Sequence, residues 1–314
     1  MEKKHFITIA IASVVLVSCQ KEQFGIAPAE EETHTVTIAA QTEKTVIDIQ
    51  ADATSVKWTG TETVTAFENG KKSKSAHIST TDGGATAVIE AEFTNVVADS
   101  YKYNAIVAKS LSDKKNPLLP SRQTATASSY DSDADILISD FSEPSSTVAT
   151  NLSLRFARPV VINRMLLLGL SENEKVREVE FRASCCLAGR FSIDYDEGKV
   201  SEYGISEQKS SIIVSYRNDE AAASDGTFPV YFLSFPTPDQ TGCGNFSVRV
   251  ATDKYIYNKT VSGKMLEFKL NTITKFKMDL STATKTAVSG DETFVQAISA
   301  DEIRSGVQCI ITAA

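Results

Sequence analysis

Short segments that alternate polar and apolar residues recur along the chain about every ten residues, and this pattern constrains the fold most. Thr35–Ala39 and Asn151–Phe156 are two such segments, and turn signals such as Asn69-Gly70 separate one from the next. Alternation with a period of two predicts a strand with one buried and one exposed face. Long helical patterns do not occur in the sequence. The chain is therefore predicted to be all-β, built as sandwiches or barrels.

The Ser- and Pro-rich break Phe141–Val148 divides this pattern into two series of strands of similar length. A chain of 314 residues fits two domains, since one domain usually takes about 100–200 residues. The predicted organisation is a signal peptide (1–18), a tether (19–34), an N-terminal β-sandwich domain (35–145), a C-terminal β-sandwich domain (146–282) and a tail (283–314).

The tail holds apolar residues beyond a domain that is already complete. Val307, Cys309 and Ile311 alternate there with other residues, so they would share one face of a strand. An apolar strand of this kind has to pair with another strand. We favour pairing with its own domain. The alternative is strand addition to the next molecule, with these three residues as the donor face.

The first nineteen residues have the form of a bacterial lipoprotein signal. Lys3 and Lys4 precede an apolar run of about a dozen residues, whereas a membrane-spanning helix needs about 20. Leu16-Val17-Ser18-Cys19 then matches a lipoprotein cleavage box, in which the small Ser18 fits the peptidase and the Cys19 thiol accepts a diacylglycerol. Two or three acyl chains hold firmly, because each buried methylene contributes roughly 0.8 kcal/mol. We expect cleavage between Ser18 and Cys19 and a lipid anchor on Cys19; the alternative is a longer signal peptide that merely contains Cys19.

Charge and composition exclude several classes of function. The net charge is −8, which disfavours binding to nucleic acid phosphates. Only His5, His34 and His77 are present, and the first two lie in the predicted signal peptide and tether. Histidine-based catalysis and a multi-histidine metal site therefore lack their residues. We expect no catalytic residues, no cofactor and no bound metal, and hence no enzyme.

Four cysteines remain besides Cys19. Export permits disulfides, and four thiols allow three complete pairings. Two of the four are adjacent and would face opposite sides of a strand, so we favour unpaired thiols. The four are Cys185, Cys186, Cys243 and Cys309.

Two further patterns have both a functional and a structural interpretation. Asp131, Asp133 and Asp135 alternate and could ligate calcium, but the spacing lacks the Gly and Glu of a helix-loop-helix site, so we favour a solvated loop. Five tyrosines could stack on sugar rings: Tyr101, Tyr103, Tyr130, Tyr255 and Tyr257. Tyr255 and Tyr257 share one strand face, so we favour a core or cross-strand role.

Several segments resemble the fimbrillins, the Bacteroidales fimbrial subunits of the FimA/Mfa-like group. In Val56–Gly70 a Trp precedes a Gly, an acidic residue and a strand, as in an early strand pair of that family. The resemblance covers most of Thr35–Leu280. The other segments that carry it are Tyr101–Val107, Leu119–Gln123, Tyr130–Leu137 and Leu152–Phe156.

The resemblance implies two transthyretin-like β-sandwich domains and an outer-membrane lipoprotein exposed at the cell surface. Gln20-Lys21-Glu22 is similar to the surface-export signal of Bacteroidetes lipoproteins. The resemblance also implies a structural subunit of a fimbrium, or pilus, used in adhesion to a host or bacterial surface. In stalk subunits of the family, a protease cuts after an Arg in the first β segment, and a C-terminal strand of a neighbouring subunit fills the groove.

This chain departs from that pattern, because no Arg occurs before Arg122. Lys44 is the one comparable basic position for a maturation cleavage. If the first strand stays, the chain suits an anchor, accessory or terminating subunit better than a stalk subunit. The alternative function is that of a surface glycan-binding lipoprotein.

Overall fold

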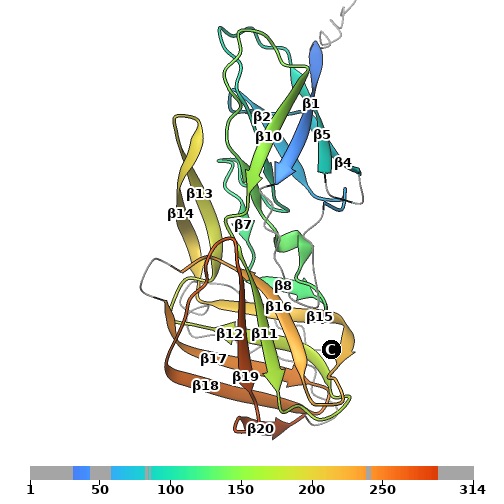
Figure 1. Cartoon of the computed structure of the whole chain (residues 1–314), viewed down its shortest axis with the longest axis vertical. Helices are drawn as coiled ribbons and strands as arrows, with labels where there is room; N and C mark the ends of the chain where they lie inside the picture. Colours follow the sequence, from blue (N-terminus) through green and yellow to red (C-terminus); the bar gives the residue numbers. More distant parts are fainter. Residues whose placement is uncertain (1–30, 43–57, 82–83, 85, 238–241, 289–314) are drawn as a thin grey trace, which may run out of the picture. The chain divides into compact units, whose positions relative to one another are not determined.

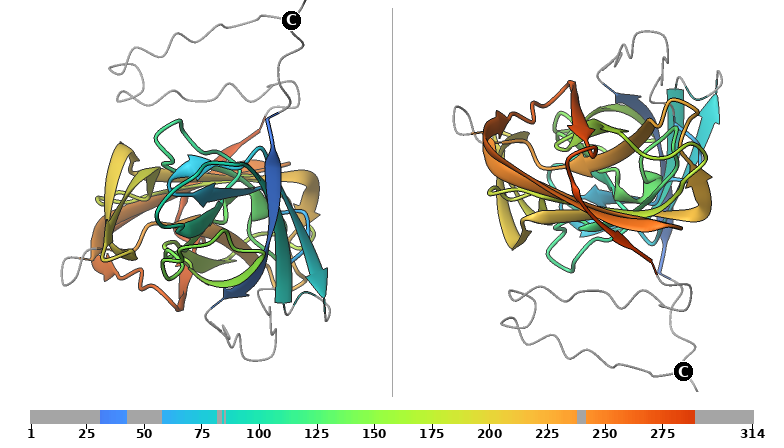
Figure 2. Two further views of the ribbon diagram at one scale, coloured as in Figure 1. Left: turned by 90° about the horizontal axis from the view of Figure 1, so that it is seen from above. Right: turned by 90° about the horizontal axis from the view of Figure 1, so that it is seen from below.

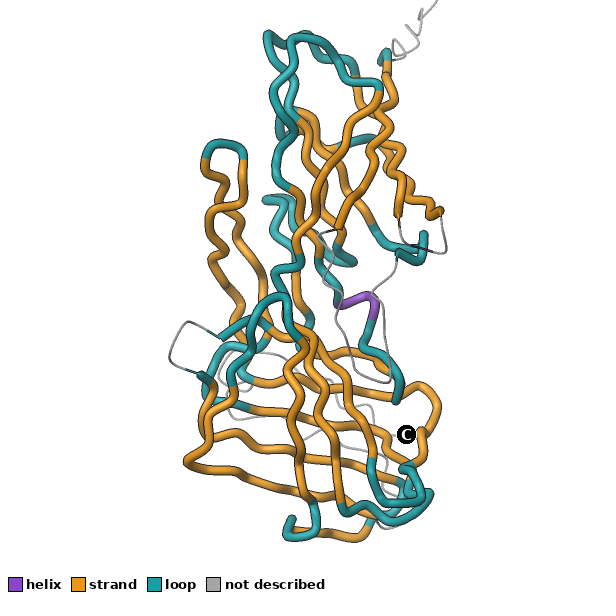
Figure 3. Tube along the Cα trace, viewed as in Figure 1, coloured by secondary structure: helices purple, strands orange, loops and turns teal. Residues whose placement is uncertain are grey.

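The computed structural model describes residues 31–42, 58–81, 84, 86–237 and 242–288. Strands make up most of this part, and the helical element that is described in full is the short 3-10 turn Ser132–Ala134 (Figures 1 and 3). The prediction of an all-β chain is confirmed. Within the described residues, no helix combines the length and the hydropathy that crossing a membrane requires.

The first sandwich is one curled sheet of eight strands around an apolar core. The two ends of the sheet approach each other, since β2 contacts β4 and β5. Its strands, in spatial order, are β3 (Lys71–Lys72), β2 (Val64–Glu68), β6 (Tyr103–Val107), β9 (Leu137–Ser139), β10 (Asn151–Ala157), β1 (Thr33–Thr42), β5 (Thr86–Thr94) and β4 (Ser75–Thr81). The core includes Val36, Ile38, Trp58, Ile89, Leu154 and Phe156.

The turn between β2 and β3 is the one that Asn69-Gly70 predicts. Asn69 has φ 48° and Gly70 has φ 76°. A two-residue hairpin turn with both central residues at positive φ matches the twist of the flanking strands, and Asn-Gly adopts it with little strain. This turn ends β2 immediately after Glu68.

The second sandwich packs a six-stranded sheet against a three-stranded sheet. Rings from both sheets meet in its core: Phe181 lies 5.4 Å from Phe232 and 5.6 Å from Phe276 between centroids. The six-stranded sheet is β20 (Thr284–Ala287), β18 (Tyr255–Leu266), β17 (Cys243–Thr252), β12 (Lys175–Arg182), β15 (Ser211–Ala221) and β8 (Arg122–Ala125). The three-stranded sheet is β16 (Phe228–Ser234), β11 (Val161–Leu168) and β19 (Ile273–Asp279).

A fourth sheet consists of a long hairpin and a short strand. The hairpin is β13 (Ala188–Asp196) and β14 (Lys199–Lys209), and β13 also pairs with β7 (Leu118–Leu119). Its turn lies at Asp196-Glu197-Gly198, where Glu197 and Gly198 have positive φ.

Strands cross the predicted boundary between residues 145 and 146 in both directions. β10 follows this boundary but pairs with β1 and β9 in the first sandwich. β7 and β8 precede the boundary but pair with β13 and β15. A period of two indicates which face of a strand is buried, but it carries no information about which strand lies beside it.

One cysteine expectation is wrong. Cys185 and Cys243 form a disulfide, with their Cα atoms 5.2 Å apart, because the antiparallel pairing of β12 with β17 places the segment after β12 beside the start of β17. Among the described cysteines only Cys186 has a free thiol, whose pKa is raised by burial. Cys309 lies outside the described residues.

Candidate functional site

All the residues that the sequence singles out for processing and strand donation lie outside the described residues. Their roles in lipidation, cleavage and donation therefore stay predictions. They are Ser18, Cys19, Lys44, Val307, Cys309 and Ile311. The structure does describe the place that the first strand occupies, and the site is built from there.

Strand β1 is an inner strand of the first sandwich. It pairs in parallel with β10 over six residue pairs and antiparallel with β5 over eight. Figure 1 labels the three strands, and in the left view of Figure 2 the blue strand β1 lies beside the teal strands. We call the space that β1 fills between β10 and β5 the first-strand slot. Without β1, both neighbours would present unpaired main-chain groups along this slot.

The slot is apolar along most of its length. Val36, Ile38 and Ala40 point into the core and are at most 2% exposed, whereas Thr35 and Ala39 face solvent. Full burial of a Val or Ile side chain contributes roughly 1.5–3 kcal/mol. Three inward side chains and two rows of main-chain hydrogen bonds therefore hold the strand in place.

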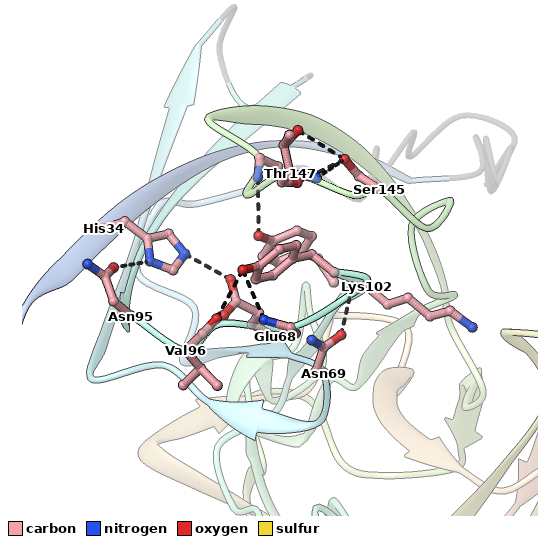
Figure 4. A network of polar contacts seen from close by, with 12 residues as sticks. His34, Glu68, Asn69, Asn95, Val96, Lys102, Ser145 and Thr147 are labelled. Atoms are coloured by element: carbon pink, nitrogen blue, oxygen red, sulfur yellow. Dashed lines mark hydrogen bonds and ion pairs between the residues drawn. The ribbon is translucent and has the colours of Figure 1, made fainter.

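The slot ends in a polar cluster that involves His34 (Figure 4). The His34 Nε2 atom lies 2.8 Å from Oε2 of Glu68, and Nδ1 lies 2.8 Å from Oδ1 of Asn95. The imidazole also stacks on Phe93, with 5.8 Å between ring centroids. The Glu68 side chain is only 5% exposed, so its carboxylate depends on donors supplied by the protein.

Tyr103 provides the second donor to Glu68. Its hydroxyl is hydrogen-bonded to the carboxylate and accepts the N–H of Ala149 at 3.2 Å. Burial, followed by the hydrogen bond to Glu68, raises the pKa of Tyr103. A tyrosine is protonated at neutral pH even without such a shift, so this phenol can act as a donor to the carboxylate. Glu68 and Tyr103 face each other on β2 and β6, so this part of the cluster does not belong to β1, and we count these two residues as part of the wall of the slot.

The sequence pattern reveals neither central residue of this cluster. His34 falls in the predicted tether, although β1 begins at Thr33. Counting back by two from Val36 would have placed His34 on the inward face. No comparable signal exists for Glu68, because an acidic residue beside an Asn-Gly turn is usually exposed.

The three aspartates considered for calcium have separate partners. Asp131 accepts the N–H of Asp133, Asp133 pairs with Lys109 at 3.3 Å, and Asp135 receives two hydrogen bonds from Arg158, at 2.8 and 2.9 Å. Asp133 is exposed as expected, but Asp135 is 17% exposed and holds a buried arginine. Across the described part of the chain, no three His, Cys, Asp or Glu side chains gather as a metal site would need.

The tyrosine pair considered for sugar stacking is covered. Tyr255 and Tyr257 meet edge to face, with 6.0 Å between ring centroids. The Nζ atom of Lys285 lies 3.6 Å from the ring centroid of Tyr255, over one face of the ring. Tyr257 is buried and bonded to Glu174. The structural role that we favoured for this pair fits these contacts.

Comparison with known proteins places similar folds among adhesion and fimbrial proteins. No family model and no curated protein matches the chain. A candidate cell adhesion protein of Bacteroides fragilis is similar in structure, with 9% identity and a TM-score of 0.46, over 84% of this chain and 100% of that one. A candidate cell adhesion protein of Bacteroides ovatus has 12% identity and a TM-score of 0.46, over 82% of this chain and 97% of that one. A fimbrial assembly protein of Parabacteroides distasonis has 11% identity and a TM-score of 0.37, over 82% of this chain and 99% of that one.

These structural neighbours are of the kind that the fimbrillin resemblance implies. With identities of 9–12% and TM-scores below 0.5, the likeness by itself carries no argument about activity.

Proposed function

We propose that this chain is a structural subunit of a surface pilus and that it joins its neighbours by strand addition at the first-strand slot. The observation that carries the proposal is the place of β1, the first described strand, which lies between two partners. A strand near the start of a chain can leave a sheet without unthreading the rest. Its departure would open an apolar groove with two free edges, and another strand is the natural occupant of such a groove.

The tail supplies the donor strand in this proposal. Val307, Cys309 and Ile311 follow the same i, i+2, i+4 spacing as the three buried residues of β1. A strand with that spacing would fill alternate pockets and would hydrogen-bond to β10 and β5. The apolar pockets would give the interaction its specificity, and the main-chain hydrogen bonds would give it its affinity.

The lipid on Cys19 would attach this non-catalytic subunit to the outer membrane, at the cell surface, for adhesion. Its place in the pilus depends on β1. Cleavage at Lys44 would separate β1 from the rest and would suit a stalk subunit, whereas an uncut chain would suit an anchor or accessory subunit. Mass spectrometry of the mature protein from outer membranes would report both the lipid on Cys19 and the residue at which the chain begins. A Cys19→Ala protein that stays anchored and matures normally would contradict the lipid anchor.

Deletion of the tail tests strand addition. Cells that express the chain ending at Gly290 should lose filaments in micrographs and detergent-resistant oligomers on gels. Within the tail, Cys309→Asp should have the same effect, because it places a charge on the donor face. Gln308→Asp is the matched control and should assemble, because it alters the opposite face. Unchanged assembly of the truncated chain would refute the donor role, and slower migration of a monomer in polysaccharide gels would favour a glycan-binding lipoprotein.

A further inference from the structure

We infer that Glu68 selects the strand that enters the first-strand slot, because it requires a hydrogen-bond donor at the position of His34. The inference rests on the proposed function, and it goes further by naming the chemistry that the entering strand must have. Its basis is the juxtaposition of a buried carboxylate with an otherwise apolar slot.

Glu68 stays with the wall of the slot, whereas one of its two donors leaves with β1. Tyr103 lies opposite Glu68 in the β2–β6 pair and remains in place. His34 belongs to β1, and its Nε2 atom lies 2.8 Å from the carboxylate. An empty slot would therefore expose Glu68 to water with one protein donor removed.

Entry of a new strand takes that water away again. An apolar residue at the position of His34 would bury the carboxylate with one donor too few, which is strongly unfavourable. A histidine, lysine or arginine there would restore a charge-assisted hydrogen bond. An acidic residue would add a like charge beside Glu68 and should be the poorest occupant.

The same requirement fixes the register of the entering strand. A slip by one residue turns the whole apolar face of a strand outward, and a slip by two would place an apolar residue against Glu68. Read in the direction of β1, the tail has Ser305 two residues ahead of Val307, Cys309 and Ile311. Ser305 therefore takes the place of His34 in this register, and its hydroxyl supplies the donor.

A nicked chain allows the selection to be measured. A site for a sequence-specific protease is placed within residues 43–57 of the full chain, so that cutting leaves β1 held by non-covalent contacts alone. Labelled synthetic peptides of residues 33–42 then compete for the slot. The peptides carry the native sequence, His34→Lys, His34→Leu or His34→Glu. Thr35→Leu is the matched control, since Thr35 faces solvent.

The native and His34→Lys peptides should bind at least tenfold more tightly than His34→Leu, and His34→Glu should bind most weakly. The control should differ from the native peptide by less than twofold. In a chain with Glu68→Leu, the preference should reverse in favour of His34→Leu. If that chain does not fold, Glu68→Gln keeps the shape and should remove the disadvantage of His34→Glu.

The outcomes separate the two proposals. Equal binding of the native and His34→Leu peptides would overturn selection by Glu68 and would leave strand addition standing. Failure of every peptide to enter the slot would overturn strand addition at this slot, and the selection with it.

Discussion

Each sandwich buries one glutamate that is hydrogen-bonded to a tyrosine, but the two glutamates hold different parts of the fold in place. Glu174 is 0% exposed and accepts hydrogen bonds from Tyr257 at 3.0 Å and from Thr252 at 2.5 Å. It also accepts the N–H of Ser171 at 2.9 Å. All of these donors belong to the second sandwich, so Glu174 fastens the loop between β11 and β12 to the turn between β17 and β18.

Glu68 in the first sandwich shares its donors between the wall of the slot and a strand. Tyr103 plays the part that Tyr257 plays for Glu174, and in both tyrosines burial and the hydrogen bond to the glutamate raise the pKa. The remaining donor, His34, lies on β1. A buried, hydrogen-bonded glutamate therefore fixes a loop in the second sandwich, where all its donors are held in place. In the first sandwich it would select a strand, because one of its donors can leave with β1.

The largest effect expected is confined to the second sandwich. Replacing both cysteines of the Cys185–Cys243 disulfide with alanine should cost about 4 kcal/mol of unfolding free energy by the loop-entropy estimate, for a loop of 58 residues. Chemical denaturation would measure the loss, and hydrogen exchange in β1 should not change. Cys186→Ser is the control with an intact disulfide. Faster hydrogen exchange in β1 would mean that loss of the disulfide in the second sandwich also destabilises the first.

Truncation of a slot-filling side chain should have the next largest effect, in the first sandwich. Ile38 is 0% exposed, and Ile38→Ala should cost about 3 kcal/mol, because it leaves a cavity under β1. The single tryptophan, Trp58, lies buried in that core and reports its unfolding by fluorescence. Ala39→Ser, on the exposed face of the same strand, should change stability by less than about 0.5 kcal/mol. Equal effects of the two substitutions would place Ile38 outside the core.

The two glutamates can be compared directly by removing their charge. Glu68→Gln and Glu174→Gln should each cost about 1–3 kcal/mol, since an amide cannot accept all the hydrogen bonds of a buried carboxylate. Hydrogen exchange mass spectrometry should show faster exchange in β1 for Glu68→Gln alone, and in the β17–β18 turn for Glu174→Gln alone. Glu172→Gln, at an exposed position, is the control. Identical exchange maps for the two variants would remove the distinction between a strand partner and a loop partner.

A smaller effect concerns Tyr195, which is held between the hairpin and the first sandwich. Its hydroxyl accepts a hydrogen bond from Asn104 Nδ2 at 3.1 Å, and burial raises its pKa to about 12. An unfolded tyrosine loses its proton near pH 10, so the folded form binds this proton more tightly. The stabilisation that this tighter proton binding gives the folded protein is complete below pH 10 and is lost as the pH rises toward 12. Between pH 9 and pH 11, the unfolding free energy of the Tyr195→Phe variant should therefore fall by about 1 kcal/mol less than that of the native protein. An unchanged pH dependence would contradict this assignment.

The sequence predicts the strands of this fold far better than it predicts their neighbours. Alternation identifies β1 through Val36 and Ile38 because burial repeats every two residues. It cannot show that β1 pairs with β10, more than a hundred residues later, since long-range pairing is decided by tertiary packing. The site is hidden for a related reason: a polar residue at an inward position, such as His34, breaks the pattern and is assigned to the tether. The Cys185–Cys243 disulfide belongs to only one of the three complete pairings that four thiols allow, and spacing alone does not distinguish these pairings.

The most direct test of strand addition reads the occupant of the slot in assembled material. Leu152 on β10 is the register partner of Ile38, so a photoreactive amino acid at position 152 lies beside whichever strand fills the slot. Cross-linked peptides from filaments with mixed isotope labels would identify that strand by mass. We predict cross-links to residues 289–314 of a neighbouring copy. Cross-links that reach only residues 33–42 of the same chain would contradict strand addition at this slot.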